Sequence, residues 1–260
     1  MKRKGTAMRI AVITGASSGI GKEFVYAVDR EYELDEIWVI ARRREELEKL
    51  QEGCRNKIVV HPLDLLQDTS TDYYGDLLKI EKPQIELLVN AAGFGHFGFV
   101  KDQDLQGQLD MIKLNSMVLT AICRLSLDYM KEGSSIINLG SNSSWQPVPI
   151  MAVYGASKSY VLSFSRALGR ELKSSGIKVM CVCPGWVTTG FQAVAGQDKY
   201  IKYVDKWYEP KEVAEKAMAD LKAGRTVSIL GAGVANQVRM VKFAPVDFVM
   251  DVWCKQQGIK

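Results

Sequence analysis

A tyrosine and a lysine stand four residues apart in the segment Tyr154-Gly155-Ala156-Ser157-Lys158. In a helix this spacing places the two side chains on one face, about one turn from each other. A phenol with an ordinary pKa of about 10 is a poor proton-transfer group near neutrality, but a fixed positive charge beside it stabilises the phenolate and lowers that pKa. The pair therefore predicts that Tyr154 passes a proton to or from an oxygen atom. A surface pair on a solvated helix is the alternative interpretation.

A glycine-rich turn near the start of the chain has the residue types that bind phosphate groups. It reads TGASSGIG over residues 14–21, follows a short apolar run directly, and leads into a helical pattern. Glycine permits a tight turn and a close approach to the backbone, and the first turn of a helix offers free N–H groups to a pyrophosphate. The spacing is G-x3-G-x-G rather than G-x-G-x-x-G, and an ordinary strand-to-helix turn is the alternative. The residues expected at the phosphates are Gly15, Ser17, Ser18, Gly19, Ile20 and Gly21.

Three arginines follow the second apolar run and bear on which dinucleotide binds. The run Ala41-Arg42-Arg43-Arg44 stands where an acidic side chain would hold the free 2′-hydroxyl of the adenosine ribose in NAD(H). A guanidinium group instead suits a 2′-phosphate, to which it donates paired, charge-assisted hydrogen bonds. NADP(H) is therefore favoured over NAD(H), with Arg42 as the expected contact. The alternative is a solvated helix face, which is what we expect of Arg43 and Arg44.

Seven short apolar runs, which alternate with segments of helical spacing, are expected to position these residues. Runs of nearly continuous Val, Ile and Leu are typical of strands whose sheet is covered by helices on both faces. The order predicts one α/β domain over residues 1–260, with a Rossmann-like, doubly wound, seven-stranded parallel sheet. Ligands bind at the carboxyl ends of such strands. The expected strands are residues 9–13, 36–40, 57–60, 85–89, 135–139, 178–182 and 226–230.

Composition and charge exclude several classes of partner. Hydrophobic residues make up 47% and charged residues 25% of the 260 residues, which are ordinary values for a globular protein. The net charge of +4 is spread along the chain and is too small to indicate a nucleic acid partner. No apolar run approaches the ~20 residues of a membrane span, and the N-terminus does not read as a signal peptide. We therefore expect no transmembrane segment.

The cysteines indicate a reducing compartment. There are five of them, an odd number without CxxC spacing, and only His61 and His96 are available as imidazole ligands. We expect no metal site and a cytoplasmic location. Cys181 and Cys183 lie two apart in an apolar run and would share one face of a strand, where a place in the core is favoured over a redox pair.

These motifs together resemble the short-chain dehydrogenase/reductase family, and their order and spacing match it from about residue 8 to residue 190. The resemblance implies an enzyme (EC 1.1.1.-) that interconverts a secondary alcohol and a ketone by hydride transfer, as a ketoreductase or hydroxysteroid dehydrogenase does. Two other function classes stay open, namely a non-catalytic dinucleotide sensor or scaffold and an epimerase of the same fold. The further motifs that carry the resemblance are Asn90-Ala91-Ala92-Gly93, Ser141 and Pro184-Gly185.

The resemblance also assigns the catalytic residues. A serine thirteen residues before the tyrosine holds the substrate oxygen in the family, which selects Ser141 and leaves Ser143 and Ser144 as alternatives. An asparagine in the long helix before the fifth strand holds a water of the proton relay, and Asn115 stands at that place; a buried or capping amide is the alternative. The implied catalytic set is Tyr154, Lys158, Ser141 and Asn115.

Further cofactor contacts follow from the resemblance alone. Lys158 would hold the nicotinamide ribose beside Tyr154, and Thr188 is the adjacent alternative to Thr189 at the carboxamide. Ala91 departs from the family, which often has a second asparagine there. The implied contacts are Asp64 and Leu65 at the adenine, Asn90, Ala91 and Gly93 on the adenosine ribose side, and Pro184, Gly185, Val187 and Thr189 at the nicotinamide end.

The substrate side is marked by aromatic residues. Residues 188–210 stand where the family has its substrate-covering segment, and they are rich in aromatics. A bulky hydrophobic alcohol or ketone such as a steroid, bile acid or 3-oxoacyl compound is expected, with core packing of the aromatics as the alternative. The residues expected to contact it are Ser141, Tyr154, Phe94, Trp145 and Phe191.

The C-terminal extension, residues 231–260, has more apolar residues than one helix face needs. It is expected to cover the active site, to seal a subunit interface or to rest on a membrane surface. The family resemblance implies a homodimer or homotetramer, formed through long helices at residues 106–130 and 153–175.

Overall fold

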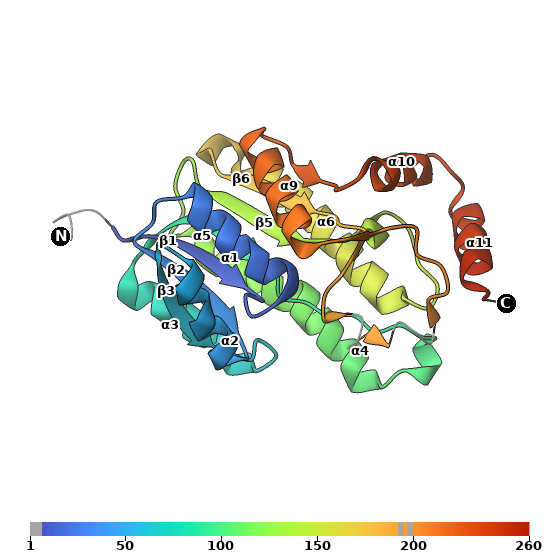
Figure 1. Ribbon diagram of the computed structural model, residues 1–260, viewed down its shortest axis with the longest axis horizontal. Coiled ribbons are helices and arrows are strands. Elements are labelled where there is room, and N and C mark those ends of the chain that lie inside the picture. The colour runs from blue at the N-terminus through green and yellow to red at the C-terminus, as the bar shows by residue number, and fades with distance from the viewer. Residues whose placement is uncertain (1–6, 192–194, 197–199, 260) are drawn as a thin grey trace.

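Seven runs of buried aliphatic residues form the central sheet of the computed structural model, which describes residues 7–191, 195, 196 and 200–259 (Figure 1). All pairings within this sheet are parallel, and the strand order is β3-β2-β1-β4-β5-β6-β9. The doubly wound, seven-stranded parallel sheet expected from the sequence is confirmed. The strands are β1 Arg9–Thr14, β2 Glu36–Ala41, β3 Lys57–Pro62, β4 Gln84–Asn90, β5 Ser135–Leu139, β6 Lys178–Val182 and β9 Val227–Ser228.

Helices cover both faces of the sheet, which explains why the strands have no polar side. In β1, Ala11 and Ile13 pack on one face with residues of helices α1 and α9, whereas Ile10 and Val12 pack on the other with residues of α3, α5 and α6. All four of these side chains are fully buried. The helices are α1 Gly19–Glu31, α2 Arg44–Glu48, α3 Asp68–Glu81, α4 Leu105–Ile112, α5 Leu119–Leu127, α6 Ala152–Glu171, α9 Pro210–Lys222, α10 Ala232–Val241 and α11 Val246–Gln257.

The strand order creates the place for a ligand. The chain begins at β1 in the middle of the sheet, winds outward through β2 and β3, and returns to β4 on the other side of β1. At such a reversal the connections from neighbouring strands leave in opposite directions and open a crevice at the carboxyl ends. The glycine turn follows β1 and residues 91–93 follow β4, so both motifs reach this crevice.

Two features of the fold were not expected from the sequence. The helix predicted over residues 106–130 is interrupted by a π-helical turn, η3 (Lys113–Val118), between α4 and α5. A second sheet pairs the short strands β7 (Trp186–Val187) and β8 (Trp207–Tyr208). It joins the two ends of the predicted substrate-covering segment, of which residues 192–194 and 197–199 lie outside the described residues. None of the described helices has the length and apolar content needed to cross a bilayer.

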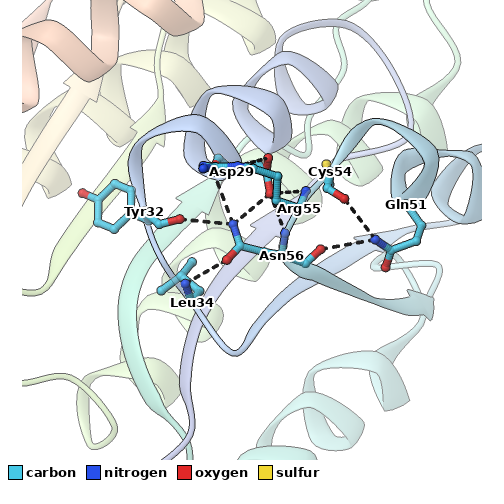
Figure 2. A network of polar contacts seen from close by, with 7 residues as sticks. All are labelled: Asp29, Tyr32, Leu34, Gln51, Cys54, Arg55 and Asn56. Atoms are coloured by element: carbon cyan, nitrogen blue, oxygen red, sulfur yellow. Dashed lines mark hydrogen bonds and ion pairs between the residues drawn. The ribbon is translucent and has the colours of Figure 1, made fainter.

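A buried carboxylate fixes the unit that carries the arginines (Figure 2). Asp29, in α1, accepts hydrogen bonds from the backbone N–H groups of Arg55 and Asn56 at 2.9 and 2.8 Å. The Asn56 amide in turn donates to the Tyr32 carbonyl and accepts from the Leu34 N–H. These contacts tie the chain just before β2 to the chain just before β3. They therefore hold both ends of the segment that contains Arg42.

We expect Asp29→Ala to lower the free energy of unfolding by about 2–4 kcal/mol, because two buried backbone donors and the Asn56 amide lose their acceptor. Urea unfolding followed by circular dichroism measures the change. The matched control is Asp76→Ala, which removes an exposed carboxylate paired with Lys79 in α3 and should cost about 0.5 kcal/mol or less. Equal losses for the two variants would contradict the role of Asp29.

The same carboxylate predicts a pH dependence. Burial by itself raises the pKa of Asp29, but the hydrogen bonds from Asn56 and Arg55 outweigh it, and the net pKa is lowered. A carboxyl group whose pKa is lower in the folded state stabilises the protein above its unfolded pKa of about 3.9, and this contribution is lost as the pH falls through the folded pKa. Wild type should therefore lose stability below about pH 4 more steeply than Asp29→Asn.

Candidate active site

A cavity of about 1000 Å³ lies at the carboxyl ends of the strands and collects most of the residues singled out in the sequence. The glycine turn, Arg42, the chain after β4, Tyr154, Lys158 and the predicted aromatic contacts all line it. Thr189 lines it and Thr188 is not among its lining residues, which favours Thr189 for the predicted carboxamide contact. Of the predicted site residues, only Asn90 and Asn115 are not among those lining the cavity.

The glycine turn has the close packing that its residue types predict. Gly15 has φ +69° and Gly19 has φ +55°, a region that side chains with a Cβ seldom adopt. A Cβ at Gly15 would lie 2.7 Å from the backbone nitrogen of Ala92, so the turn after β1 touches the chain after β4. α1 begins at Gly19, and the Ser18 hydroxyl makes no capping hydrogen bond there. The turn and the start of α1 therefore fit a pyrophosphate, which accepts hydrogen bonds from free N–H groups.

Two of the three arginines, not one, face the cavity. Arg42 and Arg43 both line it, and the Arg43 guanidinium donates to the carbonyl and hydroxyl oxygens of Ser17 at 3.3 and 3.2 Å. Arg44 instead pairs with Glu48 along α2. Arg43 is exposed to solvent, as expected, but it also lines the cavity. It stands at the N-cap of α2, and its extended backbone there directs the side chain back to the glycine turn.

Tyr154, Lys158 and Ser141 meet at the carboxyl end of β5. Helix α6 begins at Ala152, so Tyr154 and Lys158 lie one turn apart on it, and the Lys158 ammonium is 5.8 Å from the centre of the Tyr154 ring. The ammonium is buried and donates to the Leu139 carbonyl at 2.8 Å. The Ser141 hydroxyl lies close enough to the Tyr154 phenol to lower its pKa, and it donates to the Asn142 side-chain oxygen at 3.2 Å. A substrate oxygen near this phenol would meet two hydroxyl groups.

Burial shifts both titrating groups toward their neutral forms. It raises the pKa of Tyr154 to about 12, although the hydrogen bond with Ser141 opposes the shift. It lowers the pKa of Lys158 to about 8. The expectation that the lysine lowers the tyrosine pKa is not met in the protein alone. Loss of hydration of the buried phenol sets the direction of its pKa shift, and the Lys158 ammonium donates to the Leu139 carbonyl instead.

Ser144, which the sequence offered only as an alternative to Ser141, joins two parts of the site. Its hydroxyl accepts from the Ser141 N–H at 3.1 Å and donates to the Lys158 carbonyl at 2.8 Å. It therefore joins the loop that carries the serine to the helix that carries the lysine. The Ser143 hydroxyl is buried and has no partner within the described part of the chain, while the Ser143 N–H donates to Ser141. Of the three serines, Ser141 is the one that influences the pKa of the phenol.

Asn115 lies in the π-helical turn and holds two segments together. Its amide accepts from the Phe94 N–H and donates to the Phe94 carbonyl and the Ser157 hydroxyl, at 3.1, 2.9 and 3.1 Å. A Cβ at Gly93 would lie 2.8 Å from the Asn115 oxygen and 3.3 Å from the Lys158 nitrogen, so this close approach requires glycine. The side chain therefore ties the chain after β4 to α6, and the water contact implied for Asn115 stays a prediction.

The matching family model is that of the short chain dehydrogenases, and it matches residues 9–199. The chain belongs to the short-chain dehydrogenase family. This confirms the family inferred from the motifs and, at the level of the family, the oxidoreductase class that it implies. Cofactor preference and substrate are narrower questions, which membership alone does not answer.

Similar proteins and solved structures support the assignment of this chain to the short-chain dehydrogenase family. The very-long-chain 3-oxoacyl-CoA reductase of Rattus norvegicus is 33% identical over 69% of this chain, and the match spans 59% of that protein. A short-chain dehydrogenase from Sphingobium yanoikuyae, solved in complex with NADPH, has a TM-score of 0.78 at 25% identity and covers 95% of this chain and 96% of its own. The bulky-bulky ketone specific alcohol dehydrogenase of Comamonas testosteroni has a TM-score of 0.72 at 25% identity, with 95% of each chain covered.

The Asn90 side chain of this short-chain dehydrogenase lies in the core. Its amide donates to the Asn138 oxygen at 2.9 Å and to the Cys123 sulfur at 3.2 Å, between β4 and the elements packed beside it. The side chain is buried, since β4 is a central strand that helices cover on both faces. The Asn90 amide thus bonds within the core, and the contact implied for Asn90 on the adenosine ribose side stays a prediction. Cys181 and Cys183 are also fully buried, as the core interpretation requires.

The predicted substrate contacts meet around the phenol. The Phe191 ring is centred 5.5 Å from that of Tyr154 and lies edge-on to Phe97. The C-terminal extension supplies further walls, because Val249 and Trp253 of α11 also line the cavity. Of the three interpretations given to residues 231–260, the covering of the active site is thus present in the structure.

We expect Ser144→Ala to lower kcat for ketone reduction about tenfold, the equivalent of one hydrogen bond, while the dinucleotide Kd stays within about twofold. The reason is that Ser144 touches Ser141 and the Lys158 carbonyl but does not line the cavity. Stopped-flow turnover and fluorescence titration measure the two quantities. Ser163→Ala, an exposed serine of α6, is the matched control. A Ser144→Ala variant with wild-type kcat would show that the bridge is not needed.

Proposed function

We propose that this short-chain dehydrogenase is an NADP(H)-dependent oxidoreductase that interconverts a secondary alcohol and a ketone on a bulky hydrophobic substrate. The observation that carries the proposal is the meeting of Ser141, Tyr154 and Lys158 in the cavity that the glycine turn also lines. An apolar cavity with a few convergent polar groups is the usual form of a small-molecule site.

The chain's own residues account for binding and proton transfer. When bound, the nicotinamide dinucleotide supplies or accepts the hydride. The glycine turn would hold its phosphates, and Lys158 its nicotinamide ribose. With a pKa of about 12, Tyr154 carries its proton at neutral pH, as a donor to a carbonyl oxygen must. The Ser141 hydroxyl would stabilise negative charge as it develops on that oxygen.

The cofactor preference rests on Arg42 and Arg43. Both guanidinium groups line the cavity beside the glycine turn, where NAD(H) enzymes commonly have a carboxylate. Two cations at this point favour the 2′-phosphate of NADP(H). The Sphingobium yanoikuyae protein, whose complex contains NADPH, supports this choice.

The substrate class rests on the walls of the cavity. Phe97, Phe191, Trp145, Val249 and Trp253 provide apolar surface around Tyr154. The names of two relatives, a very-long-chain 3-oxoacyl-CoA reductase and a bulky-bulky ketone specific dehydrogenase, support a large apolar ketone over a small polar one. A 3-oxoacyl compound, a steroid or a bile acid all belong to this class.

Oligomer and location are part of the same proposal. An apolar groove between the α4-α5 segment and α6 contains the exposed side chains of Ile112, Met117 and Tyr160, and it suits a second copy of the chain. All five cysteines are free thiols, which supports a reducing cytoplasmic location.

We expect Tyr154→Phe to bind NADPH with nearly wild-type affinity and to lose about 10²- to 10⁴-fold in kcat, because the ring remains and only the transferable proton is removed. NADPH fluorescence measures binding, and absorbance at 340 nm with a panel of bulky ketones measures turnover. Retained turnover would overturn the assignment. Binding by the wild type without turnover of any ketone or alcohol would favour a sensor, and substrate conversion without net NADPH consumption would favour an epimerase.

We expect Arg43→Ala to weaken NADPH binding about 10- to 100-fold and NADH binding by less than about twofold, because one charge-assisted contact to a phosphate is lost. Titrating both dinucleotides into each variant gives the two Kd values. Arg44→Ala removes the neighbouring cation that pairs with Glu48 and serves as the control. Equal losses for NADPH and NADH would contradict a 2′-phosphate contact.

A further inference from the structure

Five large apolar side chains of the C-terminal helices are exposed to solvent. We name Met240, Phe243, Val246, Phe248 and Val252 the C-terminal patch. Phe243, in the link between α10 and α11, has 89% of its surface exposed, and Met240 and Phe248 have 67% and 60%. Exposed apolar side chains that gather in one place mark a surface that binds something apolar.

The C-terminal patch is continuous with the wall of the active site. α10 and α11 lie outside the sheet and its covering helices, at the end of the molecule farthest from the N-terminus (Figure 1). Met240, Phe248 and Val252 are exposed and also line the cavity that contains Tyr154. An apolar path therefore leads from the outer surface of these helices to the phenol.

Specific contacts hold α11 in this position. The Trp253 indole donates to the Pro149 carbonyl at 3.0 Å. The buried amide of Gln257 accepts from the N–H groups of Lys202 and Tyr203 and donates to the Tyr203 carbonyl. The Lys242 ammonium, at the end of α10, lies 4.3 Å from the centre of the Trp145 ring. The helices are thus anchored by their inner residues, and Phe243 and Val246 are left on the outside.

The charges of the two helices favour an anionic lipid surface. Arg239, Lys242 and Lys255 outnumber the carboxylates Asp247 and Asp251. Lys202 adds a fourth cation beside the end of α11. A Cβ atom placed on Gly258 would lie 3.0 Å from the Lys202 ammonium nitrogen. Aromatic and aliphatic side chains flanked by Lys and Arg are typical of helices that lie in the interface of a bilayer.

The place of the C-terminal patch argues against a second protein as its occupant. A rigid partner seated on Met240, Phe248 and Val252 would cover the entrance that these residues line. Fluid acyl chains would instead extend the apolar path and let a hydrophobic compound pass. The groove that contains Met117 and Tyr160 is a separate face and offers a second copy its own site.

We propose that the C-terminal patch docks on the surface of a lipid bilayer with anionic headgroups and that a hydrophobic substrate enters the cavity from that bilayer. The entry of substrate rests on the proposed function, whereas docking does not. Phe243 and Val246 are the insertion residues, and the exposed Arg239 and Lys255 are the cations that meet the headgroups.

Co-sedimentation of the full chain with vesicles tests docking. Wild type should pellet with phosphatidylcholine vesicles that contain phosphatidylserine, and less as salt is added. The double variant Phe243→Ser/Val246→Ser should bind about tenfold more weakly, because both insertion residues are lost. Neither residue lines the cavity, so turnover of a short, water-soluble ketone should stay at the wild-type level and report a folded enzyme. Ile80→Ser, which changes an equally exposed residue of α3, should bind as wild type does.

Each of the other outcomes is decisive. Absence of wild-type binding to anionic vesicles at low salt overturns docking. So does a double variant that keeps vesicle binding but has a smaller mass by light scattering, since a second copy then occupies the patch. Substrate entry is tested with a long-chain ketone dissolved in the vesicles, for which the double variant should turn over about tenfold more slowly. An equal rate for the two proteins overturns substrate entry from the bilayer. If wild type turns over no ketone at all, the proposed function fails, and the sedimentation experiment alone decides whether the protein docks.

Discussion

The buried ammonium of Lys158 is the interaction on which the site depends. An ammonium group away from water is costly unless a partner accepts its hydrogen bonds, and the Leu139 carbonyl at the end of β5 is that partner. The contact holds α6 against the carboxyl end of β5. It also places Tyr154, because Tyr154 lies one turn before Lys158 on the same helix. Ser144 strengthens the arrangement by joining the Lys158 carbonyl to the Ser141 backbone.

The segments around the site pack so closely that two positions have no room for a Cβ atom, and both are glycine. Gly93 lies where a Cβ would meet both the Asn115 amide and the Lys158 ammonium, and Gly15 lies where a Cβ would meet the chain after β4. The chain segments that follow β1 and β4 therefore approach each other and α6 closely around one cavity. The loss of hydration that follows keeps the phenol protonated and lowers the pKa of the lysine to about 8.

The cavity extends well beyond these polar groups. α10 and α11 pack few residues against the rest of the molecule, and the contacts of Trp253 and Gln257 hold them over the opening. The same two helices thus line the apolar end of the cavity and expose an apolar outer surface. The residues proposed for the chemistry lie at the carboxyl ends of the central strands. The residues that line the opening of the cavity lie in the last thirty residues of the sequence.

The sequence by itself determined the alternation of strands and helices, the parallel sheet, the glycine turn and the pairing of Tyr154 with Lys158. These features depend on periodicity and on spacing within one element, which local residue types specify. Tertiary structure decided which way individual side chains point. Asn90 turns into the core, Arg43 turns back to Ser17, and Asn115 bonds to Phe94 because each has partners far away in the chain. The raised pKa of Tyr154 was also beyond the sequence, since burial is a property of all the elements around the phenol and not of the four residues that separate it from the lysine.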